Sequence, residues 1–339
     1  MRSLNNSTRY FNPTGVDDSL LVGNPTGITD FNSNTLPFTN DSYKLIQSLT
    51  WFTSEVSLNN EAKLFKLLPS NEQEIFKLVF ANLNFLDSSQ ADHIIDFRSR
   101  TTHKIAKATL TLQAMQEDLH CEAYAAVLTE LGNSDEVMTM YRNTPILMER
   151  NHRVAELFAR HINGNDSDSM LGSAMANIML EGVLFLTSFG YIFNMGDRMI
   201  GSSQMVGFIA RDEVLAHTGI FANIFNTLRK QNKVSIKAID DCYKMMDDAV
   251  NIELDFAKYV TDNYPVLGMT YELLKRTVHN FANDRLKAVG LNEIYQSTPT
   301  TRLQKLVHQY ATEANGVRSN FFESKPRNYV RDSLDLDDF

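Results

Sequence analysis

The chain has 339 residues, of which 43% are apolar, so it is long enough to bury a large hydrophobic core. Its formal net charge of −9 gives no general attraction to nucleic acid, which requires clustered Lys and Arg side chains. Its two cysteines are too few for a disulfide framework, and no apolar run approaches the roughly 18–20 residues of a membrane span. We therefore expect a cytosolic protein that binds neither nucleic acid nor a membrane.

Residues 1–42 are predicted to form an irregular N-terminal arm. They are rich in Asn, Ser, Thr and Gly, and they repeat the turn-forming sequence Asn-Pro-Thr-Gly at residues 12–15 and 24–27. Two copies of four residues are too short to indicate a repeat architecture.

Residues 43–317 predict one helix after another and no strand of useful length. Ser70-Asn71-Glu72-Gln73 has the form of a capping box, which is expected to open a helix that runs to about residue 94. Further helices are predicted at 102–131, 166–193, 199–228, about 234–263 and about 265–288. The predicted fold class is therefore all-α, a bundle of long helices.

Residues 318–339 are predicted to form a flexible tail. It ends in the sequence RDSLDLDDF, in which acidic residues alternate with Leu334, Leu336 and Phe339. An acidic segment is usually only solvated, but large apolar side chains at regular spacing favour a peptide that docks in the groove of a partner protein.

Each of the first four long helices carries a candidate carboxylate. On the first and third helices the acid lies within a strongly apolar stretch, where burial without a partner would be costly. On the second helix, steps of three and four residues place Glu117, His120 and Tyr124 on one face. The other candidate ligands are Asp87 on the first helix, Glu181 on the third, and Glu213 with His217 on the fourth. Each alone is weak evidence, but together they match the di-metal carboxylate pattern of ferritin-like bundles.

The chemistry of this ligand set predicts a centre of two Fe or two Mn ions per chain. Two divalent metals bring four positive charges, which four carboxylates neutralise while they bridge the ions. Two imidazoles complete ligand shells that suit Fe and Mn equally, so the sequence does not choose between these metals.

The sequence also resembles the small, radical-generating subunit of class I ribonucleotide reductase, from about Trp51 to the C-terminus. The most specific matching segments are LDSSQ, QEDLHCEAY, LEGVLFLTSF, IARDE and SNFFESKPRNY. The resemblance implies a homodimer whose dinuclear metal centre activates oxygen and generates a tyrosyl radical. The large subunit, into which the C-terminal tail would dock, would use this radical to reduce ribonucleotides to deoxyribonucleotides.

The resemblance assigns the radical to Tyr124. In that family the radical is carried by the tyrosine four residues after the first histidine ligand, which is the spacing between His120 and Tyr124. Phe185, Phe189 and Ile209 would form the apolar pocket around it. Without the resemblance, Tyr124 would be interpreted as one of the 12 tyrosines packing in a core.

The resemblance also implies a path for electrons and protons between the radical and the large subunit. The path would begin at Trp51, the only tryptophan, and use Asp212 and the metal-bound His120. Tyr329 in the tail would continue it. The alternatives are that Trp51 is a core anchor and that Asp212 is only the ion-pair partner of Arg211.

The fourth helix departs from the family pattern, which is Glu-x-x-His. Ala216 occupies the place of the histidine, and His217 follows one residue later. On an ideal helix these positions lie about 100° apart, so His217 reaches the metals if a one-residue π-bulge distorts the helix. Otherwise water replaces the imidazole and metal binds weakly, or the site has lost two-metal chemistry.

Two other functions are compatible with the helical bundle. A ferritin-like oxidase acting on a small molecule in its own pocket would need neither Tyr329 nor a docking tail. A metal-binding storage or scaffolding bundle with an altered centre would generate no radical. The remaining histidines considered, His93, His103 and His152, have no partner pattern and are expected to be structural or on the surface.

Overall fold

The computed structural model describes residues 11–12, 14–15, 20–32, 36–132, 139, 142–162, 164–231 and 234–324. Within these residues all regular elements are helices, which confirms the all-α prediction. The elements are α1 (Pro37–Leu49), η2 (Thr53–Glu55), α2 (Glu61–Leu67), α3 (Ser70–Arg100), α4 (Lys104–Glu130), α6 (Pro145–Ala159), α7 (Ser167–Met179), η3 (Leu180–Leu184), α8 (Leu186–Asn194), α9 (Ile200–Asp212), η4 (Glu213–His217), α10 (Thr218–Gln231), α11 (Ile236–Asn263), α12 (Tyr271–Ala288) and α13 (Arg302–Ser324).

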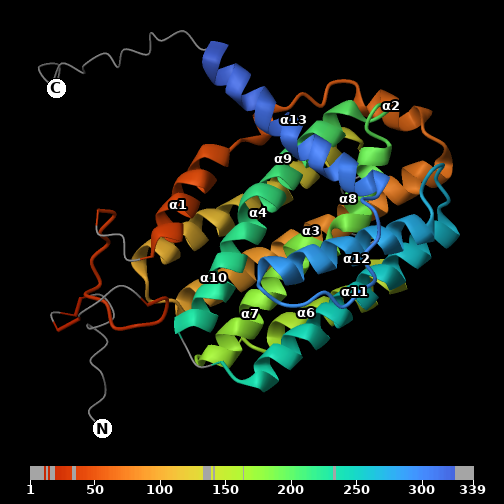
Figure 1. Cartoon of the computed structure of the whole chain (residues 1–339). Helices are drawn as coiled ribbons and strands as arrows, with labels where there is room; N and C mark the ends of the chain where they lie inside the picture. The colour runs from red at the N-terminus through yellow and green to blue at the C-terminus, as the bar shows by residue number, and fades with distance from the viewer. Residues whose placement is uncertain are drawn as a thin grey trace, which may run out of the picture.

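Four long rods make up the centre of the bundle (Figure 1): α3, α4, the α7–η3–α8 segment and the α9–η4–α10 segment. α3 packs along α4, α7 packs against α10, and η3 contacts η4. Around this centre, α11 and α12 pack against the α7–η3–α8 rod, and α13 lies along α9. The third and fourth predicted long helices are therefore present, but each is interrupted in the middle by a π-helical turn.

The α7–η3–α8 rod is the most deeply buried part of the structure. Residues 170–193 are all buried, because neighbouring helices cover every side of this rod. The segment Ser167–Asn194 is long and apolar enough to cross a membrane by length and composition, contrary to the expectation that no segment reaches this length. Its apolar window is entirely buried, and a helix that is hydrophobic all round is typical of the core of a large bundle.

The predicted capping box at the start of α3 is wrong. The helix begins at Ser70 itself, after Pro69, so the Ser70 hydroxyl lies inside the first turn and caps nothing. Gln73 instead donates from Nε2 to the carbonyl oxygen of Leu68 at 2.8 Å. The backbone N–H groups of Glu72 and Gln73 donate to the carbonyl oxygen of Pro69, so no side chain caps the start of the helix.

The three histidines without a partner pattern are structural or on the surface, as expected. His103 caps α4, accepting the backbone N–H of Ala106 at Nδ1 at 3.1 Å. His93 is buried, pairs with the Asn177 amide at 2.8 Å and stacks on Phe158. His152 is exposed on α6.

Candidate metal centre

The structure brings all six predicted metal ligands together in the core of the bundle. Their side-chain atoms form two groups in which every member lies within 4.8 Å of the others. Glu117 and Glu213 belong to both groups, which is the position expected for carboxylates that bridge two ions. The first group adds Asp87 and His120, and the second adds Glu181 and His217. All six side chains are buried.

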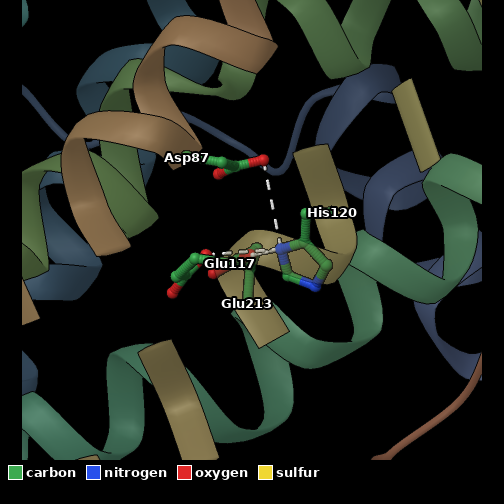
Figure 2. Close-up of side chains that lie close together, drawn as sticks. All are labelled: Asp87, Glu117, His120 and Glu213. Carbon is green, nitrogen blue, oxygen red and sulfur yellow. Dashed lines mark ion pairs between the residues drawn. The ribbon is translucent and has the colours of Figure 1, made fainter. Parts of the chain in front are cut away.

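His120 faces three carboxylates with one ring nitrogen (Figure 2). Its Nδ1 lies 3.1 Å from Glu213 Oε1, 3.3 Å from Glu117 Oε2 and 4.0 Å from Asp87 Oδ2. Its Nε2 points the other way, 3.4 Å from Asp212 Oδ2. The imidazole therefore presents Nδ1 to the cluster.

His217 mirrors this arrangement from the other side. Its Nδ1 lies 3.0 Å from Glu213 Oε2, 3.1 Å from Glu117 Oε1 and 3.9 Å from Glu181 Oε1. The histidine that comes one residue late in the sequence thus reaches the same two shared carboxylates as His120.

A π-helical turn brings His217 to this position. In η4 the backbone N–H of Thr218 bonds the carbonyl of Glu213, five residues back, and the Thr218 hydroxyl donates to the same oxygen at 2.8 Å. A π-helix has about 4.4 residues per turn, so a step of four turns by roughly 330°, close to the 300° of a three-residue step in an α-helix. The π-helical distortion, one of the three outcomes that the sequence left open, is therefore present.

A second π-helical turn, η3, carries Glu181 and was not predicted. It lies within a continuous apolar run, whose spacing fits an α-helix equally well. Glu181 Oε1 accepts hydrogen bonds from Gln90, and from Gln113 Nε2 at 3.5 Å. Its Oε2 is buried without a hydrogen bond of ordinary geometry within the described residues.

Sequence reasoning missed a layer of amide side chains around the ligands. Gln90 comes three residues after Asp87, and Gln113 four residues before Glu117, so helical spacing places them on the ligand-bearing faces. This spacing was a usable signal, but neutral amides do not stand out in an apolar stretch as carboxylates do.

The cluster fits divalent cations because several carboxylate oxygens face only the two imidazoles or make no hydrogen bond of ordinary geometry. Both oxygens of Asp87 and of Glu117, and Oε1 of Glu213, are buried without a hydrogen bond of ordinary geometry within the described residues. Buried carboxylates are stable only when paired, protonated or bound to metal. Four carboxylates and two imidazole nitrogens in two overlapping groups form a hard-to-borderline donor set that suits Fe or Mn.

Without metal, bound protons neutralise part of the negative charge of the four carboxylates. Burial raises the pKa of Asp87 and of Glu181 well above the usual range. Burial works to lower the pKa of His217, but the Glu213 and Glu117 carboxylates outweigh it and raise this pKa to about 10. Metal binding must therefore release protons from the imidazoles, and affinity should increase with pH.

The chain Trp51, Asp212 and His120 is continuous. Trp51 Nε1 donates to Asp212 Oδ2 at 2.8 Å, and the same oxygen faces His120 Nε2. Asp212 Oδ1 accepts from Arg211 Nη2 at 2.7 Å, so the ion pair weighed as an alternative is present as well. Trp51 is fully buried and stacks on Phe208.

Tyr124 is fully buried next to the first group of ligands. Burial raises the pKa of its hydroxyl well above the usual range, and the Asp87 carboxylate raises it further. Its ring packs edge-on against Phe80 at 5.9 Å between centroids, a contact that the sequence did not suggest. Phe185, Phe189 and Ile209 are buried as expected. Tyr329 and the acidic end of the tail lie outside the described residues.

Comparison with known proteins agrees with this geometry. The family model "Ribonucleotide reductase, small chain" matches residues 29–302. The ribonucleoside-diphosphate reductase subunit beta of Halalkalibacterium halodurans is 26% identical over 95% of this chain and 94% of that relative.

Two solved structures support the fold. The ribonucleotide reductase R2 subunit from Clostridium botulinum matches with a TM-score of 0.82 and 26% identity, over 89% of this chain and 97% of that one. The dimanganese(II)-NrdF of Streptococcus sanguinis matches with a TM-score of 0.68 over 85% and 98% at 17% identity, which shows the fold alone. The bundle is therefore ferritin-like, and the chain belongs to the small-chain family of ribonucleotide reductase.

Proposed function

We propose that this chain holds two Fe or Mn ions, generates a radical on Tyr124, and supplies that radical to a large subunit that reduces ribonucleoside diphosphates. The observation that carries the proposal is the pair of overlapping ligand groups, which share Glu117 and Glu213 and lie beside a buried tyrosine. The family match supports this function over a small-molecule oxidase or a storage bundle.

Each ligand group would bind one of the two ions. Asp87 and His120 would bind one ion, and Glu181 and His217 the other. Glu117 and Glu213 would bridge them. When bound, the metals would supply oxygen activation and accept an electron from the protein.

Forming a neutral radical on Tyr124 removes a proton together with the electron. The hydroxyl is buried, so the proton needs an acceptor inside the core. Asp87 is the carboxylate that acts most strongly on this hydroxyl. We assign Asp87 as the group that receives this proton.

Trp51 and Asp212 would carry the oxidising equivalent away from the centre. The Nε1 proton of Trp51 is held by Asp212 Oδ2, so an electron can leave the indole while that proton stays within the hydrogen bond. Arg211 holds the other oxygen of Asp212, which fixes the carboxylate between Trp51 and His120. Tyr329 is the proposed next carrier.

The proposed partner is a large subunit, engaged by the tail at 318–339, and the proposed assembly is a homodimer. The proposed organisation is an N-terminal arm, a helical unit and a tail, predicted at 1–42, 43–317 and 318–339. Helix α1 begins at Pro37, within the predicted arm, and α13 ends at Ser324, within the predicted tail. Cys121 and Cys242 are both free, consistent with the cytoplasmic location that we propose.

Loading the chain with metal tests the proposed function. Samples given Fe(II) or Mn(II) and then exposed to oxygen should contain about two metals per chain and show a tyrosyl EPR signal. We expect this because two ligand groups are preformed in the core. One metal or none, without a radical, would contradict the proposal.

Removing residues 330–339 tests the tail separately. The truncated chain should keep its metals and its radical, because every candidate ligand lies within the bundle. Affinity for the large subunit, measured by surface plasmon resonance, and turnover should both be lost. Undiminished affinity would show that docking does not depend on this segment.

A further inference from the structure

Gln116 makes a contact with the centre that the proposed ligand set does not include. Its side chain is fully buried on α4, and its Oε1 lies 2.8 Å from His217 Nε2. The next residue, Glu117, contacts the other ring nitrogen, with Oε1 3.1 Å from His217 Nδ1. Two adjacent residues of α4 thus contact both ring nitrogens of His217, which lies on a different helix.

The chemistry of an amide oxygen determines which nitrogen of His217 carries the proton. An amide oxygen only accepts hydrogen bonds, so Nε2 must be the donor in this contact. The proton then stays on Nε2, and Nδ1, which faces Glu117 and Glu213, becomes free to ligate when its own proton leaves.

His120 shows the same design with a charged partner. Its Nε2 faces Asp212 and its Nδ1 faces the cluster. In both imidazoles, Nδ1 therefore faces the cluster and Nε2 faces an acceptor. The acceptor is a carboxylate for His120 and a neutral amide for His217.

We propose, on the basis of the proposed two-metal function, that Gln116 is a positioning residue that holds His217 in its Nδ1-ligating orientation. The need arises from the sequence of this chain. His217 lies at the end of a π-helical turn, one residue later than the family pattern places its histidine. In this position its Nε2 contacts Gln116, which serves as the hydrogen-bond acceptor. Without this acceptor, Nε2–H would be buried unpaired and the ring would be free to rotate.

Mn(II) binding, followed by the EPR signal of free Mn(II) without oxygen, tests the proposal. Wild type should bind two ions. Gln116→Leu should weaken one of them by about 10–100-fold, the usual cost of losing a partner behind a metal ligand. Gln116→Glu, which keeps an acceptor oxygen at the same reach, should restore binding. Unchanged affinity in Gln116→Leu would overturn the proposal, whereas a wild type that fails to bind two ions would instead overturn the proposed function.

Two controls separate positioning from general damage. In a His217→Ala background, adding Gln116→Leu should cause no further loss, and a further loss would show that Gln116 acts by another route. Gln304→Leu removes a similarly buried glutamine that bonds Asn280 and caps the start of α13. This variant should lower the melting temperature and leave Mn(II) affinity unchanged. An equal loss of affinity in Gln304→Leu would reject a specific role for Gln116.

Discussion

Replacing Tyr124 with phenylalanine should abolish the tyrosyl radical while both metals still bind. The substitution removes only a hydroxyl that makes no hydrogen bond of ordinary geometry with the described residues, and it keeps the ring that packs on Phe80. Stability should therefore change by less than about 1 kcal/mol. Metal content, thermal unfolding and EPR on the same oxygen-exposed samples provide the measurement.

Tyr191 offers a matched control for this result. It is also fully buried in the core, and its hydroxyl likewise lacks a hydrogen bond within the described residues. It is not among the candidate ligand groups or the residues that act on Tyr124. Tyr191→Phe should keep the radical at its wild-type yield. A tyrosyl signal that survives in Tyr124→Phe, or that disappears in Tyr191→Phe, would move the assignment away from Tyr124.

The candidate metal ligands could be found from the sequence because a buried charge without a partner is destabilising. Asp87 and Glu181 interrupt apolar stretches that have no other reason to contain an acid, and Glu117 and His120 share a face by simple helical spacing. The long helices were predictable for a related reason, since their apolar periodicity extends over many turns. These signals depend on residues that are close together in the sequence, so they can be recognised without a structure.

The parts that could not be predicted depend on groups that are neutral or that meet only after folding. Gln116 and Gln90 carry no charge to mark them, and their partners lie on other helices. The π-helical turn at Glu181 leaves no trace in the sequence, because one extra residue in a largely apolar run does not disturb its periodicity. The π-helical turn at Glu213 could be predicted only as the condition under which His217, one residue beyond the family position, would reach the metals.

That π-helical turn leads to a second large expected effect. In the double variant Ala216→His, His217→Ala, the histidine occupies the family position but the π-turn remains. A three-residue step there turns by only roughly 245°, so the ring should point away from Glu213 and the cluster. We expect about one metal per chain instead of two, and no radical.

Deleting Ala216 should have the opposite outcome, although it also places the histidine three residues after Glu213. A π-bulge is one inserted residue in an α-helix, so its removal should return the turn to α-helical geometry and leave α9 and α10 in register. The three-residue step then turns by about 300°, within roughly 30° of the present direction of His217, and two metals should bind. Metal content and EPR compare both variants with His217→Ala, the reference for a lost ligand. Two metals in the double variant, or one in the deletion, would show that the π-turn does not decide which residue reaches the centre.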